Sequence, residues 1–135
     1  MSAAVRRGPG LNLRQSLIAI AMGAALWFLG ALIIGWIAPL GAFDGFGRVL
    51  TYALLIPGTL PFVLLVKILA GLRDDQVFAG AAVATGAAIA LDGLAIPYLP
   101  GVYGGATLAD AGAVILWGGA VAIALGALLN RPQSG

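Results

Sequence analysis

Residues 16–37 read SLIAIAMGAALWFLGALIIGWI, an uninterrupted apolar run without a single charged side chain. A helix needs about 20 apolar residues to cross the hydrocarbon core of a bilayer, so this stretch is long enough to span one. The whole chain of 135 residues is 61% hydrophobic and only 9% charged. A soluble domain carries about 25% charged residues. A water-soluble fold of this size could not hide so much apolar surface, and we predict that lipid surrounds most of the chain.

Three further runs of the same kind follow, and together the four predict an all-α fold, a bundle of four transmembrane helices. We place the spans at about 16–37, 49–69, 76–96 and 109–129. The joints APLGAFDGFGR, AGLRDD and PYLPGVYGGATL collect the glycine, proline and charged residues that turns require. The runs are continuous and rich in Ala and Leu rather than alternating, which argues against strands. The chain is thus divided into a tail (1–15), a transmembrane domain (16–129) and a second tail (130–135).

Lysine and arginine residues gather on one side of the predicted spans. Six lie on that side (Arg6, Arg7, Arg14, Lys67, Arg73 and Arg131), and Arg48 alone lies on the other. Loops rich in Lys and Arg stay in the cytoplasm, so we expect both tails there. We expect a multi-pass protein of the inner (plasma) membrane of the cell. Aromatic residues are expected at the outer interface: Trp36, Phe43, Phe46, Tyr52, Tyr98 and Tyr103.

The second span carries two prolines and a glycine near its centre, in the sequence IPGTLP at 56–61. Pro57 and Pro61 lack the amide hydrogens that would bond the carbonyls one turn earlier. The freed carbonyls need other donors in hydrocarbon, and Thr59 is the hydroxyl at hand. We predict a kink at Pro57 and Pro61. It either lets a curved helix pack or serves as a hinge or binding point.

Asp92 is the one acidic residue well inside a span, about one helical turn before Pro97. An ionisable side chain in a membrane is a candidate functional group. Arg48 is the only cation predicted on that side and could reach the carboxylate. Alternatively Asp92 bonds Tyr98, Tyr103, Trp117 or backbone freed near Pro97. A structural pair, a proton or substrate site and a partner contact all stay open.

Small residues form two ladders at helical spacing. Gly80, Ala84, Ala88 and Asp92 share one face of the third span, and Gly118, Ala122 and Gly126 share one face of the fourth. Such faces let helix backbones approach closely. We therefore expect Asp92 to point into the bundle and the third and fourth spans to pack tightly. At the start of the third span, Asp74 and Asp75 are expected to cap the helix.

The side chains that most enzymes use are missing from the sequence. It has no cysteine, no histidine and no glutamate, which removes the commonest general base and metal ligand. We expect no catalytic residues, no enzymatic activity, no metal site and no cofactor. A net charge of +2, scattered along the chain, gives no reason to expect nucleic-acid binding.

Three stretches carry a resemblance to a known family: LWFLG (26–30), LDGLAIPYLPGVYG (91–104) and LWGGAVAIALGALL (116–129). With the short basic turn after the second span, they resemble a family of small bacterial four-span integral membrane proteins, catalogued only as a domain of unknown function. The resemblance covers about residues 16 to 129. In that family an arginine is usual where this chain has Gly35 and Trp36. The resemblance implies four spans and supplies no activity.

Two function classes remain. The first is a structural or accessory component of a membrane assembly, which fits the missing catalytic groups and implies a larger complex. The second is a small transporter or channel, as a homo-oligomer, that uses Asp92 and the Pro57–Pro61 break. Small multidrug transporters have a similar length and four spans, but they rely on a glutamate in the first span, which this chain lacks.

Overall fold

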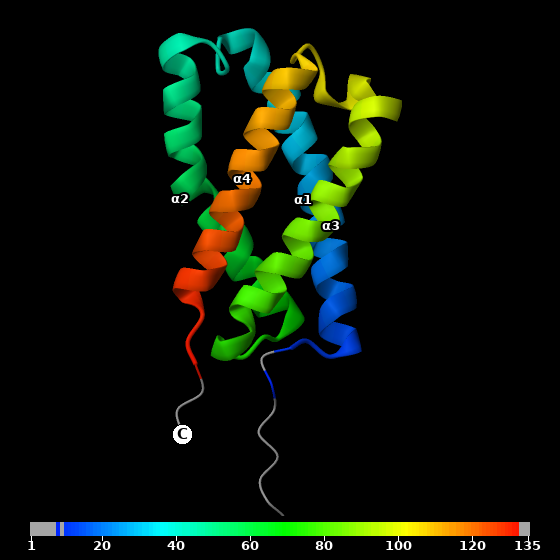
Figure 1. Ribbon diagram of the computed structural model, residues 1–135, viewed down its shortest axis with the longest axis vertical. Coiled ribbons are helices and arrows are strands. Elements are labelled where there is room, and N and C mark those ends of the chain that lie inside the picture. Colours follow the sequence, from blue (N-terminus) through cyan, green and yellow to red (C-terminus); the bar gives the residue numbers. More distant parts are fainter. Residues whose placement is uncertain (1–7, 9, 133–135) are drawn as a thin grey trace, which may run out of the picture.

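The computed structural model describes residue 8 and residues 10–132 of the chain, and all regular structure in this part is helical. Figure 1 shows four long helices side by side in one bundle. They are α1 (Leu13–Ile37), α2 (Gly45–Ala70), α3 (Val77–Tyr98) and α4 (Leu108–Leu129), and three short 3-10 helices lie between them, η1 (Ala38–Leu40), η2 (Asp74–Gln76) and η3 (Pro100–Tyr103). The predicted all-α bundle of four helices is confirmed.

All four helices are long and apolar enough to cross a membrane. The shortest two have 22 residues, which is about 33 Å of helix at 1.5 Å per residue. The hydrocarbon core of a bilayer is about 30 Å thick. Large apolar side chains, among them Leu54, Ile68, Leu94 and Leu116, are exposed on the outside of the bundle. Such an exterior suits lipid, as in a multi-pass membrane protein.

The first helix begins earlier than the predicted span because of a capping box at its start. The Asn12 side chain accepts a hydrogen bond from the Gln15 backbone N–H at 2.8 Å, and the Asn12 N–H donates to Gln15 Oε1 at 3.1 Å. This reciprocal pair satisfies two amides that would otherwise lack partners at the helix end. At the start of α4 the Thr107 hydroxyl accepts a single hydrogen bond from the Asp110 backbone N–H at 3.1 Å.

The expected acid cap of the third span is wrong. Asp74 and Asp75 lie in η2, ahead of α3, where no side-chain cap is formed by either. Asp74 instead pairs with Lys67 at 2.6 Å, and Asp75 pairs with Arg73 at 3.0 Å. A backbone amide in the first turn of α3 finds its acceptor near the end of α4: the Phe78 N–H donates to Asn130 Oδ1 at 3.0 Å.

Around the bundle the helices follow the order α1, α3, α4, α2. The most extensive contacts join α3 to α1 and to α4, whereas α2 contacts α4 and, more sparsely, α1. A Cβ atom added to Gly23 of α1 would lie 2.2 Å from the Ala84 carbonyl oxygen of α3. One added to Gly126 of α4 would lie 2.5 Å from the Ala81 Cβ of α3. The expected tight packing of the third and fourth spans is confirmed at Gly126, but Ala84 of the predicted ladder packs on α1.

The start of α1, the end of α4 and the α2–α3 turn lie at one end of the bundle, which we call the termini end (Figure 1). There the side-chain amides of Gln15 and Gln76 bond each other reciprocally, both at 3.1 Å. Gln76 also donates to the Gly10 carbonyl at 3.0 Å, and the Arg131 N–H donates to the Asp74 carbonyl at 2.8 Å. These bonds hold both terminal segments on the turn.

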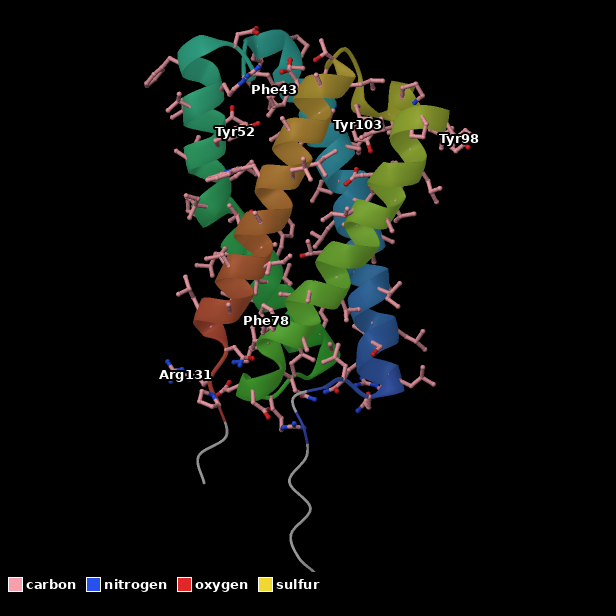
Figure 2. All side chains as sticks on the ribbon, viewed as in Figure 1. Phe43, Tyr52, Phe78, Tyr98, Tyr103 and Arg131 are labelled. Carbon is pink, nitrogen blue, oxygen red and sulfur yellow. The ribbon has the colours of Figure 1, made fainter. Side chains whose placement is uncertain are left out.

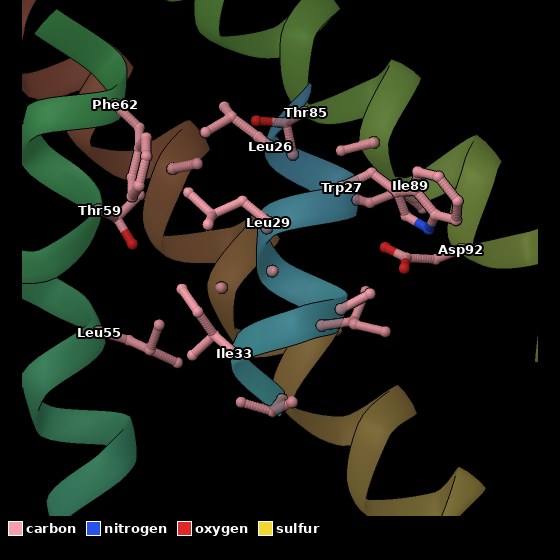
Figure 3. Close-up of a pocket in the computed structure, with 18 of the residues that line it drawn as sticks. Leu26, Trp27, Leu29, Ile33, Leu55, Thr59, Phe62, Thr85, Ile89 and Asp92 are labelled. Carbon is pink, nitrogen blue, oxygen red and sulfur yellow. The ribbon is translucent and has the colours of Figure 1, made fainter. Parts of the chain in front are cut away.

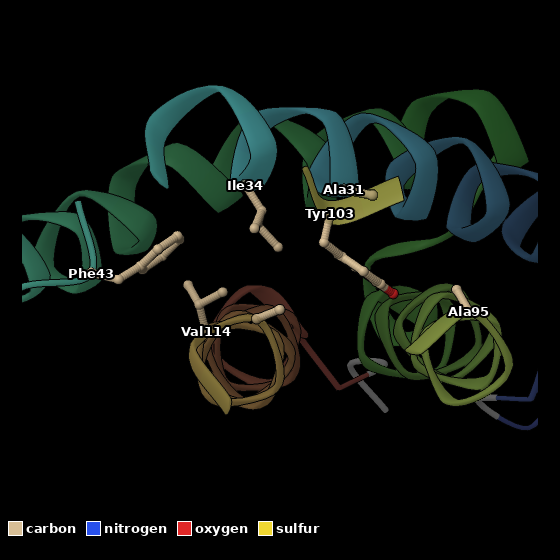
Figure 4. Close-up of a cluster of buried hydrophobic side chains, with 7 residues drawn as sticks. Ala31, Ile34, Phe43, Ala95, Tyr103 and Val114 are labelled. Atoms are coloured by element: carbon tan, nitrogen blue, oxygen red, sulfur yellow. The ribbon is translucent and has the colours of Figure 1, made fainter. Parts of the chain in front are cut away.

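The opposite end, which we call the loop end, contains η1 and η3 around an aromatic core. Phe43 and Tyr103 are buried there with Ile34 and Val114 (Figure 4). These two aromatics are therefore covered by protein and not exposed on the outside of the bundle, whereas their depth relative to the lipid–water interface stays a prediction. Tyr98 does point away from the bundle, with 77% of its surface exposed (Figure 2).

The two prolines of α2 do not interrupt it, and the helix continues through Pro57 and Pro61. Both prolines are exposed on the outer face, as is Gly58 between them. Neither ring is therefore packed into the bundle. A helix that is unbroken can still have a bent axis, so the kink at Pro57 and Pro61 stays a prediction.

The orientation can be tested with single thiols, because the chain has no cysteine of its own. Leu40, at the loop end, and Leu13, at the termini end, are both exposed. On intact cells a membrane-impermeant maleimide is expected to label Leu40→Cys, and to label Leu13→Cys only after lysis. The reverse pattern would place the termini outside the cell and overturn the orientation drawn from the basic residues.

Candidate functional site

A cavity of about 240 Å³ lies inside the bundle and is walled by all four long helices (Figure 3). Its wall is almost entirely apolar, with Leu29, Ile34, Leu55, Phe62, Ile89 and Ile115 among its residues. The polar side chains that reach it are few: Trp27, Thr51, Thr59, Thr85 and Asp92. Pockets for small molecules have this character, apolar walls with a few placed polar groups.

Two residues of α1 that line the cavity are also exposed on the outside of the bundle. Leu29 and Ile33 line the cavity, yet 37% and 38% of their surfaces are exposed. In Figure 3 both side chains lie between α1 and α2, on the side of Leu55. This is the seam where the helix packing is sparse.

Asp92 lies on the wall of this cavity and is nearly buried, with 8% of its surface exposed. The Tyr103 hydroxyl donates a hydrogen bond to Asp92 Oδ1 at 2.6 Å. Of the partners that the sequence left open for Asp92, the structure therefore selects Tyr103. The expectation that Asp92 points into the bundle is confirmed.

Tyr103 reaches Asp92 because η3 folds back onto α1. Gly104 has a φ of +65°, and a Cβ atom there would lie 2.7 Å from the Gly35 Cα. Only glycine tolerates both the backbone angle and this contact. The Tyr103 side chain is completely buried beside Ala31 and Ala95 (Figure 4). Burial, and then the hydrogen bond to Asp92, raise the pKa of the Tyr103 phenol to about 12, so it remains a donor at neutral pH.

Trp27 supplies a second donor at the same place. Its indole nitrogen is buried and has no hydrogen-bond partner in the part of the chain that the structure describes. Figure 3 shows that nitrogen pointing toward the Asp92 carboxylate. A buried N–H group without a partner is uncommon in proteins and calls for an explanation. The acceptor on that side is the Asp92 carboxylate, so Trp27 is a neutral donor directed at the same acid as Tyr103.

Arg48 does not pair with Asp92, so this expectation is wrong. Its guanidinium binds Asp110 Oδ1 at 2.7 Å, and its Nε donates to the Phe43 carbonyl at 2.8 Å. Both partners lie at the loop end, around the start of α4 and the loop before α2. The sequence could not decide among the three aspartates near that end of the helices, Asp44, Asp92 and Asp110.

Thr59 does line the cavity, although not in the role expected of it. Its hydroxyl forms no hydrogen bond with the described residues, including the carbonyls freed by Pro57 and Pro61. The side chain points into the cavity from α2, across from α3 (Figure 3). The cavity thus brings together Asp92 and Thr59, which the sequence singled out separately.

The sequence predicted neither the cavity nor the position of Trp27 in its wall. Trp27 lies in an apolar run that reads the same on every face, so nothing marks the side that turns inward. Gly118 and Ala122 were expected to pack on the third span, but they line the cavity instead. The space next to Gly118 is open, with no atom within 4 Å of an added Cβ.

A carboxylate with two donors beside it, in an apolar chamber, can bind and orient a small molecule. The resemblance to a four-span family of unknown function stays a prediction. Comparisons of the chain with protein-family models, with curated proteins and with solved structures found no match.

Proposed function

We propose that this protein is a small transporter of the bacterial inner membrane, without enzymatic activity, that binds its substrate in the central cavity. The observation that supports the proposal most strongly is the cavity itself, which both Asp92 of α3 and Thr59 of α2 line. The seam between α1 and α2 gives the substrate a path from the lipid. The exposed prolines of α2 support the proposal, because missing backbone hydrogen bonds lower the resistance of this helix to bending.

Access to the cavity can be tested with the apolar photoreactive probe 3-trifluoromethyl-3-phenyldiazirine. After illumination in liposomes, we expect label on Val63 and Val114, which line the cavity and are buried. Filling the cavity with Gly118→Phe should remove label from these two residues. Label on Leu94, which faces lipid, serves as the internal control and should not change. Label confined to lipid-facing residues in the unaltered protein would overturn the proposal.

An accessory role in a membrane assembly is the second candidate. It is favoured by the outer face of α3, where Gly86, Ala90 and Gly93 are exposed and leave a smooth surface. Small residues on a lipid-facing helix permit close approach of another helix, from a partner or a second copy. Purification in mild detergent followed by native mass spectrometry separates the candidates. An accessory protein is expected to retain a partner of fixed stoichiometry, and a transporter to be recovered alone or as a homo-oligomer.

A further inference from the structure

The Asp92 carboxylate has no countercharge within the described residues. Three of the cations form salt bridges with other acids: Arg48 with Asp110, Lys67 with Asp74, and Arg73 with Asp75. Arg14 and Arg131 belong to the termini end, at the other end of the helices from Tyr103 and η3. The groups that face Asp92, Tyr103 and Trp27, are neutral donors. Asp92, the acid that lines the cavity, is therefore a carboxylate whose negative charge no protein cation compensates among the described residues.

A ligand can supply what the carboxylate lacks. An ionised carboxylate without a partner is unfavourable inside a membrane, and a neighbouring cation relieves this, whereas a neutral molecule does not. Hydrogen bonds between ionised groups are also about twice as strong as those between neutral ones. The free oxygen of Asp92 faces a chamber in which no protein cation competes for it. The site therefore favours a positively charged group on the ligand.

The chemical character of the remainder of the ligand follows from the other residues that line the cavity. Apart from Asp92 and Trp27, the cavity offers hydrocarbon surface and the threonine hydroxyls. A compact apolar body fits this space, and Leu29 and Ile33 of its wall are also exposed toward lipid, where such molecules partition.

We infer that the substrate of the cavity is a lipophilic amine, bound in its protonated form with the ammonium group on Asp92 and the apolar body along α1 and α2. This inference rests on the proposed function, because it names the substrate class of the same cavity. The amine has hydrogens to donate to Asp92.

Three probes with the same phenylbutyl body test the inference. They are 4-phenylbutylamine, 4-phenyl-1-butanol and 4-phenylbutyrate, which are respectively cationic, neutral and anionic at pH 7. Binding is measured to the protein in nanodiscs, with empty nanodiscs of the same lipid subtracted. The amine is expected to bind at least about tenfold more tightly than the alcohol, because its ammonium group supplies the countercharge to Asp92 that a hydroxyl group cannot supply. The carboxylate probe should bind most weakly.

Charge removal gives the matched variants. Asp92→Asn keeps the shape of the side chain and should abolish the preference for the amine while leaving binding of the alcohol. Asp110→Asn removes the same charge at the loop end, outside the cavity, and should preserve the preference. The ligand series on the unaltered protein needs no variant, so it remains decisive if Asp92→Asn does not fold.

The outcomes separate this inference from the proposed function. Equal binding of amine and alcohol would overturn the amine as substrate class and leave the cavity as a binding site. Binding of none of the three probes would overturn both. A preference for the amine that persists in a folded Asp92→Asn variant would overturn the assignment of the ammonium site to Asp92.

Discussion

Gly23→Ala is expected to lower the free energy of unfolding by about 1–3 kcal/mol, the usual effect of overpacking a well-packed contact. The added methyl group would lie 2.2 Å from the Ala84 carbonyl oxygen and 3.0 Å from the Ala87 Cβ. Backbone cannot move aside as a flexible side chain can, so α1 and α3 must separate. Titration of the helical signal with sodium dodecyl sulfate in mixed micelles measures the loss.

Gly30→Ala on the same helix is the matched control. A Cβ atom at Gly30 would have no atom within 4 Å. Alanine favours the helix over glycine by about 1 kcal/mol, so this variant should be as stable as the parent or more so. If Gly23→Ala behaved like Gly30→Ala, the contact between α1 and α3 would not be as close as described.

Tyr103→Ala is expected to be still more damaging, by about 3–5 kcal/mol, as for other large buried aromatic side chains. Tyr103 is completely buried and joins η3 to α1 and to Asp92. Tyr103→Phe keeps the ring and removes only the hydroxyl. It removes the hydrogen bond that Tyr103 donates to the buried Asp92 carboxylate, so we expect a loss of about 1–3 kcal/mol. The same detergent titration ranks the two variants.

Two controls test whether the stability lost in the Tyr103 variants comes from the Tyr103–Asp92 hydrogen bond. Tyr98→Ala, at an exposed aromatic close to the same end, should change stability by less than about 0.5 kcal/mol. Tyr103→Phe introduced into an Asp92→Asn background should lose less than in the parent, because part of the bond is already altered. Strict additivity of the two substitutions would mean that the charge of the Asp92 carboxylate adds nothing to the bond with Tyr103.

The helices could be predicted because each rests on local sequence. Apolar length sets the spans, and glycine and charge set the turns, so predicted and observed helices differ only by a few residues at their ends. The start of α1 at Leu13 was missed, although Asn12 and Gln15 carry the spacing of a capping box. The burial of Asp92 could be expected as well, because a carboxylate avoids lipid.

The neighbours of each helix could not be predicted, and the site depends on them. Alanine and glycine occur on every face, so the ladder that contains Ala84 fits α1 as well as α4. The choice of Asp110 over Asp92 by Arg48 follows from the fold of the loop end. The cavity is the space that remains once all four helices are placed, and no single segment of sequence encodes it.

The order of the helices around the bundle has a consequence for biogenesis. The first helix makes its most extensive contacts with the third, not with the second, which follows it directly in the chain. A nascent chain that has inserted only its first hairpin therefore lacks its main interface, and Gln15 lacks Gln76. Assembly must wait until the third segment leaves the ribosome and enters the bilayer. Until then the face of the first segment that packs on the third is covered only by lipid or by an insertion factor.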